Sequence, residues 1–126
     1  MKKWSLSFVV LVLSLAAFSQ DTIAKVQEEK KNELIFFSNN GCGKCETSQA
    51  FFEENHMPYT KFLVTDNRPL MYEYIHQKTK GKNVAIGYPV IIYGDSIYFS
   101  IKNIHRTLEE IKERMIADDV LKNPEP

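Results

Sequence analysis

The two cysteines of this 126-residue chain, Cys42 and Cys45, lie three positions apart and constrain the fold more than any other feature. Two cysteines are too few for a disulfide framework or for a zinc site built from four thiolates. They follow a short apolar strand candidate, 33–38, and the turn-forming loop 39–41, and they open a helix predicted over 42–55. The pair is therefore predicted to lie at the start of a helix that follows a buried strand.

The amino-terminal segment 1–19 has the pattern of a secretory signal peptide. A basic start precedes the apolar run 6–18, which is shorter than the roughly 18–20 residues that a membrane-spanning helix needs. Small residues precede the predicted cleavage after Ser19. No cysteine lies near this position, which argues against a lipid-anchored lipoprotein. We therefore expect a periplasmic or secreted protein, and an uncleaved anchor is the alternative that would bring membrane contact. Outside the cytoplasm thiols are not kept reduced by default.

The charge balance argues against nucleic acid as a partner. Sixteen basic residues stand against sixteen acidic ones, and removal of the predicted signal takes two lysines away, which leaves a slight acidic excess. Phosphate binding instead favours a net basic face. With 44% hydrophobic and 25% charged residues, the composition is that of an ordinary globular domain, and we expect a monomer.

After the signal, the chain alternates strand and helix patterns. Residues 20–32 are a polar extension without assigned chemistry, 33–117 are the predicted domain, and 118–126 are a predicted flexible tail. The predicted elements are a strand at 33–38, a helix at 42–55, a strand at 59–64, a helix from near Pro69 to about Lys80, hairpin strands at 90–93 and 96–100, and an amphipathic helix at 103–117. The order β-α-β-α-β-β-α predicts an α/β domain with one four-stranded mixed sheet and helices on both faces.

A cysteine pair at a helix start favours redox chemistry. The first turn offers unpaired amide N–H groups and the positive end of the helix dipole, so the pKa of the Cys42 thiol is expected to be lowered, with Lys44 adding positive charge. Cys45 lies one turn further along, where it can bond Cys42 or resolve a mixed disulfide. A purely structural disulfide is the alternative, but closing a loop of four residues stabilises a fold by only about 2 kcal/mol in loop-closure theory.

Two further alternatives use the same region without redox turnover. The thiolates could hold zinc, copper(I) or a cluster with His56, His76 or His105 as additional ligands, although none of these histidines has metal-ligand spacing to the pair. We therefore expect no metal. A fold that only docks partners, without any reaction at the cysteines, is the other alternative.

A second feature, Tyr88-Pro89, lies far from the cysteines in sequence and just ahead of a predicted strand. Proline in this position can introduce a bend or a cis peptide and leave the neighbouring backbone free to pair with an extended substrate. An ordinary loop proline is the alternative.

Together these segments resemble the thioredoxin-fold oxidoreductases and, within them, the glutaredoxins, over about residues 33–116. The resemblance is carried by Ile35-Phe36-Phe37-Ser38, Cys42-Gly43-Lys44-Cys45, Met57-Pro58-Tyr59, Gly87-Tyr88-Pro89-Val90-Ile91-Ile92 and Gly94-Asp95. It implies Cys42 as the nucleophile, Cys45 as the resolving thiol and Pro89 as a cis-proline that faces them. Tyr88 would contact the substrate backbone, and we expect Lys44 on the same substrate-binding side.

Departures from the family refine this prediction. Glutaredoxins usually carry a basic residue where this chain has Asn39-Asn40, and a Gly-Gly followed by Cys-Asp or Ser-Asp where it has residues 98–101. In the family those features hold glutathione, so their absence argues against glutathione dependence, and we expect no cofactor. We expect protein thiols or disulfides as substrates and a separate redox partner. Phe36 replaces the buried aspartate of thioredoxins. The predicted function is an exported thiol–disulfide oxidoreductase.

Overall fold

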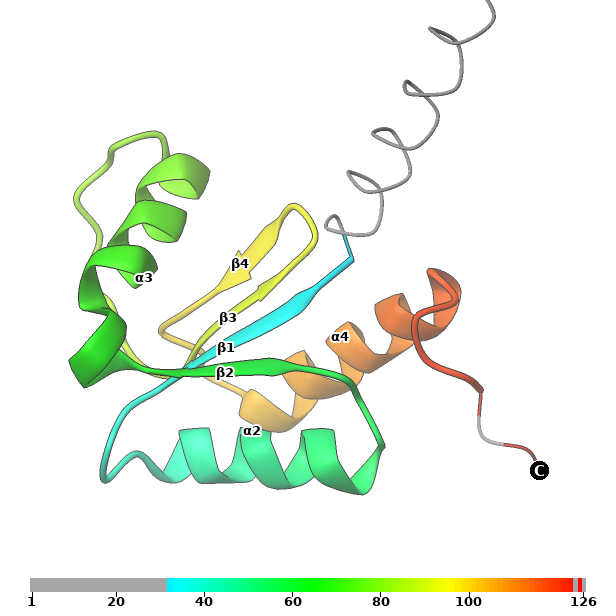
Figure 1. Cartoon of the computed structure of the whole chain (residues 1–126). Coiled ribbons are helices and arrows are strands. Elements are labelled where there is room, and N and C mark those ends of the chain that lie inside the picture. The colour runs from blue at the N-terminus through cyan, green and yellow to red at the C-terminus, as the bar shows by residue number, and fades with distance from the viewer. Residues whose placement is uncertain (1–31, 124, 126) are drawn as a thin grey trace, which may run out of the picture. The chain divides into compact units, whose positions relative to one another are not determined.

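A computed structural model describes residues 32–123 and 125 as an α/β domain with one four-stranded mixed sheet and three helices (Figure 1). The elements are β1 (Leu34–Ser38), α2 (Gly43–Glu54), β2 (Thr60–Leu63), α3 (Val64–Thr79), β3 (Val90–Tyr93), β4 (Ser96–Tyr98) and α4 (Ile104–Ala117). The predicted signal peptide 1–19 and nearly all of the predicted extension 20–32 lie outside the described residues. Within the described part of the chain, no helix is long and apolar enough to cross a membrane.

The sheet has the strand order β2-β1-β3-β4. β1 runs parallel to β2 and antiparallel to β3, and β3 pairs with β4 in an antiparallel hairpin. The two central strands, β1 and β3, are buried at every position, which explains why their sequences are continuous apolar runs rather than alternating ones. The predicted α/β class and mixed four-stranded sheet are confirmed, and they are compatible with a thioredoxin-like fold.

Alternate residues of β1 belong to two separate core clusters, because successive strand residues point to opposite faces of a sheet. Leu34 and Phe36 belong to a first cluster, which takes its helical residues from α2 and α4. Ile35 and Phe37 belong to a second cluster, which takes its helical residues from α3. The predicted apolar stripe of α4 is confirmed, since all four of its residues are buried: Ile104, Leu108, Ile111 and Met115.

Two element boundaries differ from the sequence prediction by more than one residue. α3 begins at Val64 rather than near Pro69, because Val64 is fully buried in the second cluster and continues directly from β2. Asn67 interrupts the helix with φ −130°, so Pro69 falls in the first turn of the continuing segment, where its missing N–H is tolerated. β4 ends at Tyr98, and Ser100 has a left-handed φ of 51°, which cannot continue a strand.

A polar network fastens the end of α4 to the β3–β4 hairpin. The Tyr93 hydroxyl donates to Asp118 Oδ2 at 2.7 Å, and the Arg114 guanidinium lies 5.2 Å from the centre of the Tyr93 ring. Arg114 also donates to Ser96 Oγ and to the Tyr98 hydroxyl, each at 2.8 Å. The network therefore gives the buried Tyr93 hydroxyl a partner and fixes the helix end on the sheet.

Truncation of Phe52 tests the first cluster. Phe52 is fully buried and its ring lies 5.4 Å from that of Phe36 and 5.2 Å from that of Tyr59. Phe52→Ala is expected to lower the free energy of unfolding by about 3–5 kcal/mol. The neighbouring Phe51 is only partly buried, so Phe51→Ala should cost clearly less. Urea unfolding followed by circular dichroism measures both, and equal losses would contradict the described packing.

Alkaline unfolding tests the environment of Tyr93. Burial and the hydrogen bond to Asp118 raise the pKa of Tyr93 above its ordinary value of 10.0. The stability that this shift contributes is fully present below pH 10 and is lost as the pH rises through the raised pKa. Tyr93→Phe should therefore reduce the alkaline slope of the unfolding free energy, while costing about 1 kcal/mol at neutral pH through the lost hydrogen bond. A slope for Tyr93→Phe equal to that of wild type would contradict this environment.

Candidate active site

Cys42 occupies the cap position at the start of α2. Its backbone is extended, with φ −103° and ψ 104°, and its Sγ accepts a hydrogen bond from the Cys45 amide at 3.1 Å. The Cys42 carbonyl accepts from the amides of Cys45 and Glu46, each at 3.1 Å. A helix cap normally uses an oxygen as its side-chain acceptor, and here a sulfur takes that place.

Cys42 and Cys45 are joined by a disulfide bond, with their Cα atoms 5.2 Å apart. This separation lies within the ordinary range for disulfides, so the pair bonds without displacing the helix start. Cys42 is partly exposed, whereas Cys45 is only 2% exposed and belongs to the first core cluster. An incoming sulfur can therefore reach Cys42 and not Cys45.

The turn between β1 and α2 depends on Gly41. Its φ of +68° lies in the left-handed region, which glycine adopts without the steric penalty of a side chain. The preceding Asn39 stabilises the turn, since its Oδ1 accepts from the Asn40 amide at 3.0 Å. The turn places Cys42 at the edge of the sheet where β1 ends.

Tyr88 and Pro89 reach the same edge through the pairing of β1 with β3. Phe37 near the end of β1 is opposite Val90 at the start of β3, so the residues that follow β1 and those that precede β3 emerge together. The Tyr88-Pro89 peptide bond is cis, the conformation that the resemblance implies. Cys42 and Tyr88 both pack against the first core cluster, which joins two segments that are far apart in sequence.

Lys44 makes a contact that the sequence did not predict. Its ammonium donates a hydrogen bond to the carbonyl of Ile101, in the segment that follows β4. From the sequence, a lysine at this position predicts only a positive charge near Cys42. Its hydrogen-bond partner is not predictable, because every residue type has a backbone carbonyl.

The contacts of Ser100 are likewise not predicted by the sequence. Its Oγ accepts from the Gly87 amide at 2.9 Å and donates to the Ala85 carbonyl at 3.0 Å, and its own amide donates to the Gly87 carbonyl at 2.9 Å. The only sequence signal is its position in the segment 98–101, where the chain departs from the glutaredoxin pattern. Ser100 thus ties the residues before Tyr88 to the segment that follows the hairpin.

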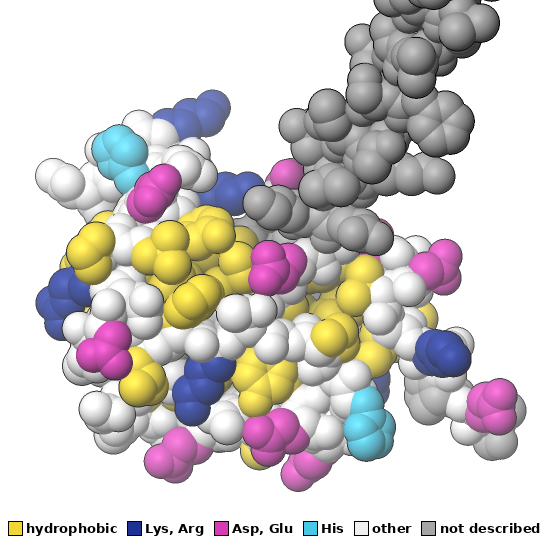
Figure 2. Space-filling model, in the orientation of Figure 1, with side chains coloured by type: hydrophobic (Ala, Val, Ile, Leu, Met, Phe, Trp, Pro, Cys, Tyr) yellow, Lys and Arg dark blue, Asp and Glu magenta, His cyan; other side chains and the backbone are white. Residues whose placement is uncertain are grey.

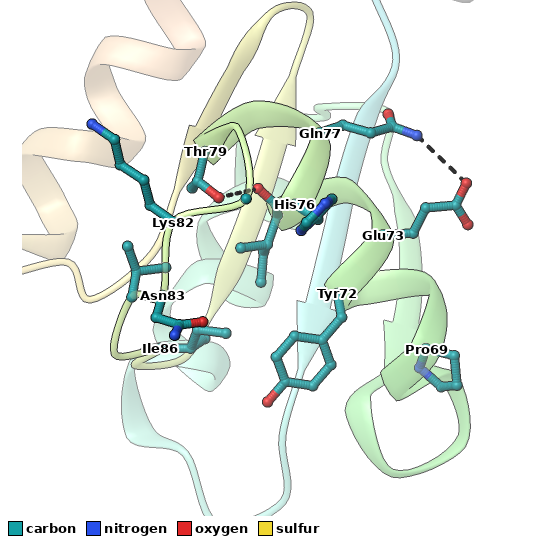
Figure 3. Close-up of a pocket in the computed structure, with 12 residues that line it drawn as sticks. Pro69, Tyr72, Glu73, His76, Gln77, Thr79, Lys82, Asn83 and Ile86 are labelled. Atoms are coloured by element: carbon teal, nitrogen blue, oxygen red, sulfur yellow. Dashed lines mark hydrogen bonds between the residues drawn. The ribbon is translucent and has the colours of Figure 1, made fainter.

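A pocket of about 620 Å³ lies between α3 and the segment that follows it. Figure 3 shows Tyr72 and His76 of α3 opposite Asn83 and Ile86 of that segment. Tyr72 and Val84 are among the large hydrophobic residues that are exposed, at 46% and 38%, and Figure 2 shows hydrophobic side chains gathered on the side of the molecule that carries α3. Neither cysteine lines the pocket.

The three histidines lie on separate elements. His56 follows α2, His76 belongs to α3 and His105 belongs to α4. Among residues 32–123 and 125, no three histidine, cysteine, aspartate or glutamate side chains gather in the arrangement of a metal site.

No protein-family model matches the chain, and no curated protein matches it.

Selective alkylation tests the unequal exposure of the two sulfurs. In the single-cysteine variants, the thiol of Cys45→Ser (which keeps Cys42) should react with iodoacetamide at least about tenfold faster than the thiol of Cys42→Ser, because only Cys42 is accessible. Mass spectrometry of quenched samples gives both rates. In denaturant the two rates should converge, and equal rates in the folded proteins would contradict the assignment.

Proposed function

We propose that this chain is an exported, glutaredoxin-like thiol–disulfide oxidoreductase that acts on protein thiols or disulfides. The observation that carries the proposal is the disulfide between Cys42 and Cys45 at the start of α2, with one accessible and one buried sulfur. The proposal includes a glutaredoxin-like topology with helices on both faces of the sheet. It also takes the region 33–117 as the working domain.

In the reducing direction, the Cys42 thiolate attacks one sulfur of a target disulfide. The target S–S bond breaks, a mixed disulfide forms, and the released target thiolate takes a proton from solvent. Cys45 then loses its proton and attacks the Cys42 sulfur, which frees the second target thiol and leaves the Cys42–Cys45 disulfide. Two electrons pass from the pair to the target, and a dithiol partner must return them. The oxidising direction is the reverse.

The helix start supports Cys42 as the nucleophile. The Cys45 amide points at the Cys42 sulfur, and the unpaired N–H groups of the first turn carry partial positive charge. Both favour a thiolate over a thiol at this position. Cys45, which is buried one turn further along, is suited to resolving the intermediate because solvent and competing reagents do not reach it.

Tyr88 and Pro89 support an extended polypeptide as the substrate. No hydrogen bond from the described residues occupies the backbone N–H or carbonyl of Tyr88, so both groups are available to pair with an added strand. The segments by which glutaredoxins hold glutathione differ in this chain, at 39–40 and 98–101. We therefore propose protein substrates and no resident cofactor.

The location in the periplasm or outside the cell rests on the pattern of residues 1–19, which lie outside the described part of the chain. Cleavage after Ser19 would release a slightly acidic monomer, which fits neither nucleic acid nor an anionic membrane as a partner. An exported dithiol needs a partner to restore its redox state, because no glutathione pool does so there.

Trapping with Cys45→Ser tests the proposed reaction. Without the resolving thiol, the mixed disulfide on Cys42 should accumulate and be recovered with substrate proteins from the periplasm of an expressing bacterium, as bands that disappear on reduction. Wild-type protein should reduce insulin in the presence of a dithiol, and Cys42→Ser should fall to the background rate.

The matched control is Cys42→Ser, which keeps the buried Cys45 and should trap nothing. The same preparation reports export, because the intact mass should lack residues 1–19. Equal trapping by both variants would contradict Cys42 as the nucleophile. Stoichiometric zinc or copper on an inactive, anaerobically isolated protein would replace the proposal with a metal-binding role.

A further inference from the structure

One short segment, residues 100–101, is hydrogen-bonded to both halves of the candidate active site. On one side, Lys44 from the first turn of α2 donates to the carbonyl of Ile101. On the other side, Ser100 bonds Ala85 and Gly87, in the segment that leads into Tyr88. We call these contacts the Ser100 clasp. They connect the cysteine helix to the Tyr88-Pro89 loop through a segment that belongs to neither.

The backbone conformation of Ser100 indicates that the side-chain hydroxyl, rather than the turn, is the reason for a serine at this position. Its φ of 51° lies in the left-handed region, where a glycine would be more favourable than a serine. Although the side chain is exposed, its Oγ makes two of the three hydrogen bonds to residues 85 and 87. A turn alone would not need this hydroxyl.

Close packing fixes the loop on both sides. A Cβ atom on Gly87 would lie 3.2 Å from Ser100 Cα, a tight contact that a larger residue could make only if one of the two segments shifted by a few tenths of an ångström. Ile86, between the two bonded residues, packs against the second core cluster. Ile101 is 7% exposed and belongs to the first cluster together with Cys45. The clasp is therefore anchored in both cores.

We propose that Ser100 is a positioning residue that sets the place of the Tyr88-Pro89 loop relative to Cys42, and that Lys44 acts through the same segment. This inference rests on the proposed function, in which a polypeptide pairs with Tyr88 while its sulfur meets Cys42. Neither side chain needs to touch the reacting sulfurs. Their loss should therefore affect an extended peptide substrate far more than a small disulfide that does not use the loop.

Kinetics with two substrates test this distinction. Ser100→Gly and Ser100→Ala should both lower kcat/KM for a disulfide-linked peptide about tenfold, mainly through KM, because two hydrogen bonds to the loop are lost. Reduction of a small aromatic disulfide should stay within about twofold of wild type. Glycine suits the left-handed backbone at this position, so Ser100→Gly removes the hydroxyl without adding backbone strain. If Ser100→Gly and Ser100→Ala lower kcat/KM equally, the missing hydroxyl is the cause. Lys102→Met, at an exposed neighbouring lysine, is the control and should match wild type.

A double-mutant cycle tests whether Lys44 and Ser100 act through one segment. Lys44→Met should also weaken the reaction with the peptide, and Lys44→Arg should restore most of it because arginine can donate to the same carbonyl. If the segment is shared, the double variant Lys44→Met with Ser100→Ala should lose less than the product of the two single losses. A loss equal to that product would overturn the shared role.

Amide hydrogen exchange tests the clasp without reference to activity. The Gly87 amide donates to Ser100 Oγ, so its exchange should be about tenfold faster in Ser100→Gly and Ser100→Ala and unchanged in Lys102→Met. If wild-type protein exchanges no disulfides, the proposed function fails while this measurement still reports the clasp. If wild type is active and the Ser100 variants match it with the peptide, the positioning role is overturned whatever the amide shows.

Discussion

The antiparallel pairing of β1 with β3 is the constraint on which the candidate site depends. The chain leaves β1 toward Cys42 at the same edge of the sheet where it enters β3 from Pro89, because the two strands run in opposite directions. A shift of one residue in this pairing would exchange the two sets of side chains that each strand buries in the two core clusters. Since all nine residues of β1 and β3 are buried, such a shift is strongly disfavoured. The position of the cysteine turn relative to the cis peptide thus follows from core packing.

Much of this arrangement was predictable because it follows from local patterns of residue types in the sequence. Continuous apolar runs marked β1 and β3, apolar spacing marked α4, and a cysteine pair between a strand and a helix pattern marked the site. The early start of α3 was not predictable in this way. Thr65, Asp66 and Pro69 have the residue types of a helix start, but burial of Val64 in the second cluster extends the helix back to the end of β2.

The contacts around the cysteines were not predictable either, for a different reason. Lys44 and Ile101 are 57 positions apart, and Gly87 and Ser100 are 13 apart. Each contact uses a backbone carbonyl or amide, which every residue type supplies, so the identity of the partner carries no information. Only the tertiary structure shows that the exposed Lys44 bonds to Ile101, directly beside the exposed Ser100, and that Ser100 in turn bonds to the segment before Tyr88. The left-handed backbone of Ser100 is likewise invisible in a sequence that has no glycine there.

In the proposed reaction, the cap position of Cys42 has a chemical consequence as well as a structural one. In the reduced protein the same amides that cap α2 would face a thiolate, and a charged acceptor makes a stronger hydrogen bond than a neutral one. Stabilising the thiolate stabilises the dithiol relative to the disulfide, which makes the pair more oxidising by 30 mV for each 1.4 kcal/mol. Lys44 would add to this effect if its ammonium lay near the sulfur, but its hydrogen bond to the Ile101 carbonyl shares that charge with another acceptor. With the ammonium held at Ile101, the amide at the helix start rather than Lys44 would be the main stabiliser of the thiolate, and Lys44 would act on the position of the substrate through the clasp.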